Sequence, residues 1–335
     1  MTVLLLGGAG YIGSHATSIL IENGYDVVVI DNLITGHQAS LDSKARFYKG
    51  DIRDINFMRK VFVEEKNIEG IMHFAAFSLV GESMDQPLKY FNNNVYGAQI
   101  MLKVMQEFGV KHIVFSSTAA IYGISEKSPI IEEMLTNPIN PYGQSKLMME
   151  QMMKWQAKAS DMNYVSLRYF NVAGAKADGS IGEAHKCETH LIPIILQVAL
   201  GQRDEVTIYG DDYQTFDGTN IRDYIHVEDL IDAHIRALEY LKQGGKSDVF
   251  NLGSANGYSN SEVLEAARKV TKQTIPAKIG ARRPGDPDTL VASSQKAKDV
   301  LGWAMQFNSI QEIIASAWKW HQGHPDGYDN YTPLN

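Results

Sequence analysis

The chain has few of the features that mark secreted, membrane-bound or nucleic-acid-binding proteins. Its 335 residues include one cysteine, Cys187, so no disulfide can form within the chain, and we expect a reducing compartment, the cytoplasm. No apolar run approaches the ~18–20 residues that a membrane helix needs. The formal net charge of −8 argues against a general nucleic-acid binder. An anionic ligand would therefore need local N–H donors or positive charge, supplied by glycine turns, helix N-termini or single arginines.

Short apolar runs alternate with amphipathic stretches through the first half of the chain. The first run, Thr2–Leu6, follows no basic residue and meets glycines at once, which favours a buried strand over a signal peptide. Runs that are apolar throughout are typical of a parallel sheet covered on both faces. We therefore predict an α/β fold with a doubly wound, Rossmann-like parallel sheet. The predicted strands are Val3–Leu6, Asp26–Ile30, Arg46–Tyr48, Ile71–Phe74, His112–Ser116 and Tyr164–Arg168, and the predicted helices are Tyr11–Glu22, Asp54–Lys66, Leu88–Glu107 and Tyr142–Ala159.

A glycine turn follows the first strand and opens the first helix. Gly7, Gly10 and Gly13 are spaced three apart, which differs from the G-x-G-x-x-G form. Glycine permits positive φ and close backbone approach. The helix N-terminus that begins at Tyr11 and Ile12 offers free N–H groups to a pyrophosphate. The turn therefore predicts a bound dinucleotide.

Acidic residues after the next two strands extend this prediction. Asp31 ends the second strand, 18 residues beyond Gly13, where a carboxylate can bind a ribose 2′-hydroxyl. No arginine follows within several residues to take a 2′-phosphate, which favours NAD over NADP. Asp51 and Ile52 would line the adenine. The alternative to ligand binding is that each acidic residue is a solvated loop residue or a helix cap.

Tyr142 and Lys146 form a pair four residues apart, so on a helix they point to the same side. The lysine can hold the tyrosine oxygen as a phenolate. With a nicotinamide nearby, the pair makes a base for moving a proton and a hydride off one carbon. A Y-x-x-x-K pattern alone is usually an exposed helix turn, but here the patch Ser116–Thr118 precedes it at the expected distance. The pair therefore predicts a catalytic site.

The second half of the chain is less regular, with longer loops after about Asn171. We predict residues 1–171 as the NAD-binding Rossmann-like domain, with residues of about 221–251 returning to it. Residues 172–335 would form predominantly a smaller α/β substrate-binding lobe. This half contains the predicted helices Val227–Leu241 and Ser261–Lys272 and the apolar run Val249–Leu252.

The sequence resembles the extended short-chain dehydrogenase/reductase family, and within it the UDP-sugar 4-epimerases. The glycine turn, the tyrosine–lysine pair and Thr118 carry the family's motifs. Further runs match in order along nearly the whole chain, including the second lobe. These runs are Gly10-Tyr11-Ile12-Gly13-Ser14-His15, Asp31-Asn32-Leu33, Val80-Gly81-Glu82-Ser83, Phe115-Ser116-Ser117, Asn140-Pro141-Tyr142-Gly143, Arg168-Tyr169-Phe170-Asn171, Arg222-Asp223-Tyr224-Ile225-His226-Val227 and Arg282-Arg283-Pro284-Gly285-Asp286.

The resemblance implies an activity that interconverts UDP-galactose and UDP-glucose through a transient 4-keto sugar, with NAD as a bound catalyst. Tyr142 would remove the proton of the sugar 4-hydroxyl while the C4 hydride moves to the nicotinamide and later returns to the other face of the sugar. Lys146 would help to ionise the tyrosine and bind the nicotinamide ribose. Thr118 would bridge the sugar O4 and Tyr142. A base at neutral pH needs the tyrosine pKa lowered by about 3 units from ~10.

The same resemblance implies the remaining site residues and a homodimer through the helices near Asn94–Glu107 and Tyr142–Ala159. Arginine gives bidentate contacts to a diphosphate, although either arginine here could instead form a surface ion pair. The implied cofactor-binding residues are Gly7, Gly10, Tyr11, Ile12, Gly13, Asp31, Asn32, Asp51, Ile52, Phe74, Ala75, Ala76, Asn94, Ser116, Tyr142, Lys146, Tyr169 and Phe170. The implied substrate-binding residues are Thr118, Tyr142, Asn171, His190, Leu191, Tyr209 near the uracil, Arg222, Arg283, Asp286 and Leu290.

Four positions depart from the family's pattern. Leu6 stands where threonine is usual, and Ser78 where a lysine often contacts the cofactor. Cofactor binding would be weaker, or another group would replace that contact. His190 replaces an expected asparagine. Leu290 stands where a tyrosine or cysteine commonly gates the sugar pocket, and a residue smaller than tyrosine would admit an N-acetyl group, so turnover of UDP-N-acetylated sugars is a hypothesis.

Other functions remain as alternatives. A nucleotide-sugar 4,6-dehydratase or decarboxylase needs an extra acid and base, typically Asp-Glu, where this chain has Ala119-Ala120. A 4-epimerase of pentose or uronate UDP-sugars is harder to exclude. A non-catalytic NAD-sensing regulator would often lose the tyrosine–lysine pair, which is present.

The pattern His185-x-Cys187-x-x-His190 suggests zinc, but no second Cys/His pair completes a tetrahedral set. We therefore expect a substrate loop there and no metal. The methionine-rich run 148–153 is expected to pack in the core and at an interface.

Overall fold

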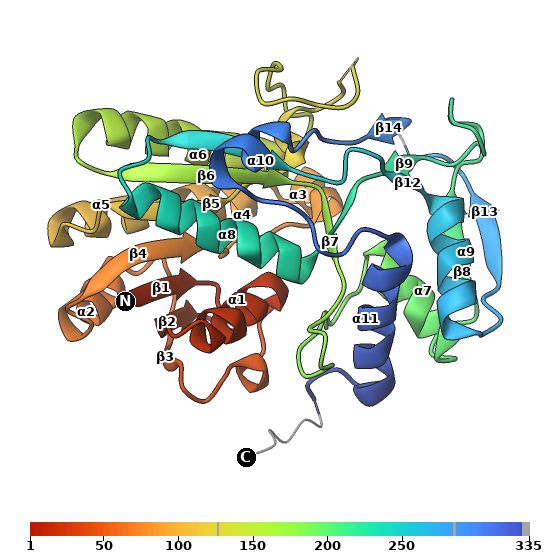
Figure 1. The fold of residues 1–335 in the computed structure, drawn as a ribbon, viewed down its shortest axis with the longest axis horizontal. Coiled ribbons are helices and arrows are strands. Elements are labelled where there is room, and N and C mark those ends of the chain that lie inside the picture. Colours follow the sequence, from red (N-terminus) through yellow and green to blue (C-terminus); the bar gives the residue numbers. More distant parts are fainter. Residues whose placement is uncertain (126, 284–285, 330–335) are drawn as a thin grey trace.

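The centre of the molecule is a seven-stranded parallel sheet, in the order β11-β6-β5-β4-β1-β2-β3 (Figure 1). The computed structural model describes residues 1–125, 127–283 and 286–329. No helix within these ranges is both long and apolar enough to cross a membrane. The strands are β1 Thr2–Leu6, β2 Asp26–Asp31, β3 Arg46–Lys49, β4 Ile68–His73, β5 His112–Ser116, β6 Asn163–Tyr169 and β11 Asp248–Leu252.

Helices cover both faces of this sheet. In β1, Val3 and Leu5 join an apolar cluster with residues of α1 and α8, whereas Leu4 and Leu6 join a second cluster with residues of α2, α5 and α6. All four side chains are fully buried, because alternate residues of a strand point to opposite faces. The predicted doubly wound fold is confirmed. The helix bounds are α1 Tyr11–Glu22, α2 Ile55–Glu64, α5 Gly97–Phe108, α6 Pro141–Ala159 and α8 Val227–Lys242.

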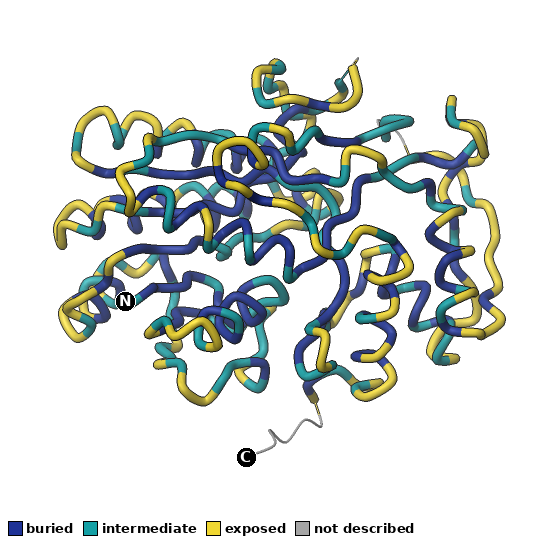
Figure 2. The backbone as a smooth tube through the Cα atoms, viewed as in Figure 1, coloured by how far each residue is buried: buried dark blue, intermediate teal, exposed yellow. Residues whose placement is uncertain are grey.

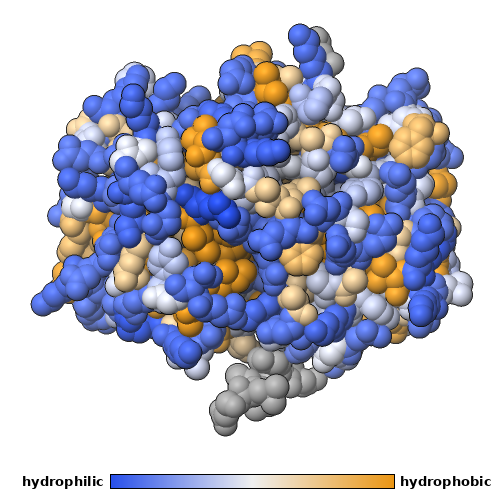
Figure 3. Space-filling view, in the orientation of Figure 1, coloured by the Kyte–Doolittle hydropathy of each residue, from blue (hydrophilic) through white to orange (hydrophobic). Residues whose placement is uncertain are grey.

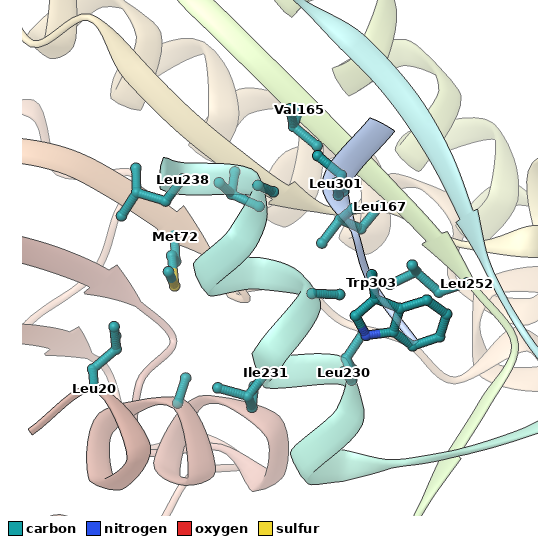
Figure 4. Close-up of a cluster of buried hydrophobic side chains, with 14 of the residues drawn as sticks. Leu20, Met72, Val165, Leu167, Leu230, Ile231, Leu238, Leu252, Leu301 and Trp303 are labelled. Carbon is teal, nitrogen blue, oxygen red and sulfur yellow. The ribbon is translucent and has the colours of Figure 1, made fainter. Parts of the chain in front are cut away.

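The first apolar cluster also contains residues from near the C-terminus (Figure 4). Leu301, at the end of α10 (Gln295–Leu301), and Trp303 pack there against α8. The Trp303 indole N–H donates to the Asp229 carbonyl oxygen at 2.9 Å. Segments that return to the first lobe therefore extend beyond the predicted range of about 221–251. The division into two domains itself stays a prediction.

A second lobe packs around its own apolar cluster, formed mainly by α7, α9 and α11. Small sheets surround it, with orders β10-β7, β12-β9-β14 and β13-β8. Buried strands and helix faces lie inside both lobes, and exposed loops surround them (Figure 2). The bounds are β7 Asn171–Ala173, α7 Leu191–Ala199, β8 Val206–Tyr209, β9 Ile221–Arg222, β10 Tyr224–His226, β12 Tyr258–Ser259, α9 Asn260–Thr271, β13 Ala277–Gly280, β14 Thr289–Leu290 and α11 Ile310–Gly323.

The prediction of a single helix over Leu88–Glu107 is wrong. The chain forms the short helices α3 (Val80–Asp85) and α4 (Pro87–Tyr90), then a π-helical turn over Phe91–Tyr96, and only then α5. π-helical turns occur frequently at functional sites. Here the turn directs Asn94 inward, where its side-chain N–H group donates to the Ser145 hydroxyl of α6 at 2.9 Å. Periodicity could not show this turn, because the side chain that it redirects is polar.

Candidate active site

The glycine turn lies at the carboxyl end of β1, beside the end of β4. Gly7 has φ +78°, and a Cβ there would lie 2.6 Å from the Ala75 backbone nitrogen. A Cβ on Gly13 would lie 2.1 Å from the Gly7 carbonyl oxygen. At Gly10, by contrast, the nearest atom would be 3.5 Å away, an ordinary contact. The fold therefore requires glycine at positions 7 and 13 and leaves space beside Gly10, next to the free N–H groups of α1, which fits a pyrophosphate.

Replacing Gly10 separates cofactor binding from folding. We expect Gly10→Ala to keep the melting temperature within a few degrees and to weaken NAD binding about tenfold or more, because its methyl group fills the space that a pyrophosphate would use. Gly13→Ala should instead lower the melting temperature, because its methyl group meets backbone. Thermal unfolding and calorimetric NAD titration check both variants. Unchanged NAD affinity in Gly10→Ala would contradict this assignment.

Asp31 holds the turn and keeps acceptor capacity for a ligand. Its carboxylate accepts the N–H of Ala9 at 3.0 Å and that of Leu33 at 2.8 Å, while burial raises the pKa of the group. A carboxylate has about four lone-pair sites, so two backbone bonds leave room for a ribose hydroxyl. Among the described residues, Asp31 has no arginine partner.

Asn32 and Asp51 lie together beyond Asp31, with the Asn32 amide donating to Asp51 at 3.2 Å. Arg53, which the sequence analysis did not weigh, pairs with the same carboxylate at 2.6 Å. This contact holds the pKa of Asp51 down at about 2. Ile52 is buried in the second apolar cluster. Arg53, which lies beside the residues expected to bind the adenosine, is therefore already paired with Asp51.

The departures at Leu6 and Ser78 have different surroundings. The Leu6 side chain is fully buried in the second apolar cluster, and its carbonyl oxygen accepts the N–H groups of Phe74 and Ala75, both at 2.8 Å. The backbone of position 6 thus joins the turns after β1 and β4 without a threonine hydroxyl. Ser78 is exposed in the segment that follows Ala76.

The start of α6 places the tyrosine–lysine pair. The Asn140 side chain accepts the Gly143 N–H at 2.8 Å and caps the helix, with Pro141 at its first position. Tyr142 therefore lies in the first turn. Lys146 lies one turn further, where its Nζ donates to the Ser116 carbonyl oxygen at 2.7 Å. The structure brings the predicted pair together at the end of β5.

Burial dominates the electrostatics of this pair. It lowers the pKa of Lys146 to about 7, with Glu150 acting in the opposite direction. It raises the pKa of the Tyr142 phenol, which a hydrogen bond with Thr118 opposes. Burial thus favours the protonated phenol. A nearby positive charge, such as an oxidised nicotinamide ring, would favour the phenolate.

Tyr169 and Ser116 are connected to a histidine that sequence reasoning missed. The His234 ring on α8 has its Nδ1 2.8 Å from the Leu230 carbonyl oxygen and its Nε2 2.8 Å from the Ser116 hydroxyl. The carbonyl fixes the proton on Nδ1, so Nε2 accepts from the serine. Burial raises the pKa of Tyr169, opposed by a hydrogen bond with Ser116. His234 lies 118 residues along the chain from Ser116, and no local motif marks it.

Arg222 and Asp286 form an ion pair at the other end of the site. Asp286 also accepts hydrogen bonds from the Asn220 amide at 3.0 Å and the Tyr213 hydroxyl at 3.3 Å. Arg222 lies on β9, with Leu290 of β14 as its register neighbour. The structure thus joins predicted substrate residues that are 64 positions apart.

Arg283 lies with its guanidinium carbon 4.1 Å from the centre of the Tyr209 ring. It has no carboxylate partner among the described residues, whereas Arg282 pairs with Asp288 at 2.8 Å. Arg283 is therefore available for an anionic ligand next to an aromatic ring, which suits a nucleoside diphosphate. Pro284 and Gly285 of the same matching run lie outside the described residues.

Leu290 packs near the residues that follow Thr118. Like Phe170, it packs against a small apolar cluster that includes Ala119, the residue after Thr118. The Asn171 N–H donates to the carbonyl oxygen of Asp223, next to Arg222 in sequence, at 3.1 Å. The expected sugar-pocket residue Leu290 thus lies against the cluster that follows Thr118 in the chain.

Three predicted residues make contacts that sequence reasoning did not anticipate. The Tyr11 hydroxyl donates to the Gly174 carbonyl oxygen at 2.6 Å, between the lobes. The Asn94 side-chain oxygen accepts the Phe77 N–H at 2.9 Å, which ties the π-helical turn to the segment after β4. The His190 side chain lies 2.9 Å from Glu183 and 2.8 Å from Glu188, so it is engaged there, and Leu191 begins α7.

A parallel nucleotide-binding sheet with this glycine turn, and a tyrosine–lysine pair beside Thr118, define the class of dinucleotide-dependent enzymes in which a tyrosine serves as the base. Residues 3–253 match the NAD dependent epimerase/dehydratase family. The chain belongs to this family.

Several named proteins are similar to this chain over almost its full length, and their names agree with this assignment. The UDP-glucose 4-epimerase of Streptococcus mutans is 61% identical over 98% of this chain and 99% of its own. A crystal structure of UDP-glucose 4-epimerase has a TM-score of 0.97 at 55% identity, covering 98% of this chain and 100% of the other. The Bifidobacterium longum enzyme, solved in complex with NAD⁺ and UDP, has a TM-score of 0.92 at 40% identity over 98% of this chain and 100% of its own.

Proposed function

We propose that this protein is a UDP-glucose 4-epimerase, an isomerase that interconverts UDP-galactose and UDP-glucose with bound NAD. The observation that carries the proposal is the position of Tyr142 and Lys146 at the end of β5, where Lys146 donates to the Ser116 carbonyl oxygen and Tyr142 lies in hydrogen-bonding reach of Thr118. Nearly full-length similarity to enzymes of this name supports it. In the structure, Ala119 and Ala120 form a short 3₁₀ turn directly after Thr118, where a dehydratase would need an acid and a base.

The side chains account for the proton transfers of this reaction. NAD, which the glycine turn and Asp31 would hold, would supply a reversible acceptor for the C4 hydride. Tyr142 takes the proton of the sugar 4-hydroxyl and returns it to the 4-keto group, while Thr118 holds the same oxygen. Lowering the tyrosine pKa by about 3 units needs ~4 kcal/mol of preferential phenolate stabilisation. A protonated Lys146, one helical turn from Tyr142, supplies part of it.

The direct test is conversion of UDP-galactose to UDP-glucose by the purified protein. We expect turnover without an added oxidant and with NAD far below the sugar concentration. UDP-pentose and UDP-uronate substrates, measured in parallel, test the alternative sugars. No interconversion, or consumption of one NAD per sugar, would rule the function out, and faster turnover of a pentose or uronate would favour that epimerase instead.

UDP-N-acetylglucosamine is a second candidate substrate, favoured by Leu290 in the apolar cluster beside Ala119. A leucine side chain is smaller than the tyrosine common at this position, which leaves room for the N-acetyl group. We expect Leu290→Tyr to lower kcat/KM for UDP-N-acetylglucosamine at least tenfold while changing that for UDP-glucose little. Steady-state kinetics with both sugars check this. Negligible turnover of the N-acetylated sugar by the wild type would contradict its assignment as a substrate.

A homodimer through α5 and α6 is supported by an apolar depression between these helices. It has a volume of about 720 Å³, and Met148, Met152 and Trp155 line it. Trp155 is 68% exposed, which is unusual for a large aromatic side chain outside an interface. We expect Trp155→Asp to give a monomer in analytical ultracentrifugation at concentrations where the wild type is a dimer. A monomeric wild type would contradict the dimer. A cytoplasmic location remains an inference from composition.

A further inference from the structure

Four titratable side chains gather in the loop that leads from β7 to α7, beside α11 (Figure 1). Glu183 and Glu188 are buried, with side-chain exposures of 6% and 3%. His185 and His190 lie beside them and are partly exposed. One ligand atom from each of the four lies within 4.8 Å of the others. Two buried carboxylates this close together need positive charge between them.

The two imidazoles direct the same nitrogen to the same two carboxylates. His190 Nδ1 is 2.9 Å from Glu183 and 2.8 Å from Glu188, and His185 Nδ1 is 3.2 Å and 3.3 Å from them. One ring N–H carries a single hydrogen, so it cannot bond well to both carboxylates at once. Bonds of about 2.0–2.1 Å to a tetrahedral zinc ion place neighbouring ligand atoms about 3.3–3.4 Å apart. For the ion to enter, the short histidine–carboxylate distances would therefore lengthen, while the widest pair among the four atoms, which lie within 4.8 Å of one another, would close.

We propose that Glu183, His185, Glu188 and His190 bind one zinc ion that holds this loop. Two carboxylates balance the charge of Zn²⁺ while both imidazoles stay neutral. Imidazole nitrogen suits zinc, whereas Mg²⁺ and Ca²⁺ prefer sets of oxygen ligands. This proposal replaces the expectation of no metal, which counted only cysteine and histidine as partners. Cys187 is exposed and is not one of the four.

The backbone around this cluster is already held in position. The N–H groups of Thr189 and His190 both donate to Glu188 Oε1 at 2.8 Å, and the Trp320 indole N–H of α11 donates to the Glu183 carbonyl oxygen at 3.3 Å. A cavity of about 260 Å³, lined in part by Glu183, His185 and Glu188, gives an ion access. Since His190 occupies the N-cap position of α7, the ion would fix the start of that helix and the turn before it.

Zinc uptake by the full chain tests the proposal. Wild type is stripped with a chelator, titrated with ZnCl₂, and measured by elemental analysis and thermal unfolding. We expect one zinc per chain and a higher melting temperature, with no rise on adding Ca²⁺ or Mg²⁺. His185→Asn should lose the stoichiometric zinc and the rise in melting temperature. Cys187→Ser, in the same loop, is the matched control and should keep both.

Three results would overturn the proposal: substoichiometric zinc in wild type, unchanged uptake by His185→Asn, or uptake lost in Cys187→Ser. Should His185→Asn fail to fold, Co²⁺ in the wild-type chain decides. Visible bands of four-coordinate cobalt without a thiolate band support a nitrogen and oxygen ligand set. A thiolate band, or the weak spectrum of hydrated cobalt, contradicts it.

Discussion

Tyr142→Phe is expected to lower kcat for UDP-galactose by about 10²–10⁴-fold, the usual range for removing a general base. The change deletes only the hydroxyl that would take the sugar proton. Since Thr118 and Lys146 stay in place, NAD content and KM should change little. Steady-state kinetics and the melting temperature of the variant give the measurement.

The matched control for this variant is Tyr96→Phe, the same change at an exposed tyrosine in the π-helical turn. It should keep wild-type kcat. A Tyr142→Phe enzyme within a few-fold of wild type would remove Tyr142 from the role of base. A large loss of NAD from Tyr142→Phe would assign the residue to cofactor binding instead.

Lys146→Met is expected to lower kcat by about 10²–10³-fold, the range seen when one preorganised electrostatic contact is removed. It should also change the pH profile. Without this cation the phenolate is less stable, so the pKa of Tyr142 rises and the acidic limb of kcat/KM moves to higher pH. The Ser116 carbonyl oxygen loses its 2.7 Å donor, which should also lower the melting temperature. The pH profile separates the catalytic effect from this structural one.

Lys154→Met on the same helix is the control, because Lys154 is exposed. It should leave both the rate and the pH profile unchanged. A Lys146→Met enzyme that is slower at every pH by one constant factor would show that Lys146 does not lower the tyrosine pKa.

The central sheet and the catalytic pair could be predicted because their signals are local. Apolar runs such as Val3–Leu6 mark strands buried on both faces, and the spacing of Tyr142 and Lys146 places both on one side of a helix. The helix α11 was missed although Ser309 and Glu312 form a capping box at its start. That signal was present in the sequence.

Other features depend on contacts between distant segments, which no local pattern shows. His234 reaches Ser116 across the face of the sheet. His190 matched a family position for substrate binding, but it lies against Glu183 and Glu188. Whether it also contacts substrate stays a prediction. The face of the molecule shown in Figure 3 is mostly polar, with apolar side chains visible in places between the polar ones; hydropathy there marks no site.

The fate of the hydrogen at C4 of the sugar tests the central claim most directly. UDP-galactose carrying deuterium at C4 is converted by the purified protein with NAD far below the sugar concentration, and the product is analysed by mass spectrometry and NMR. The account predicts UDP-glucose that keeps the deuterium at C4, because the hydride leaves and returns within one closed site. Loss of the label, or uptake of deuterium at carbon from D₂O, would contradict it.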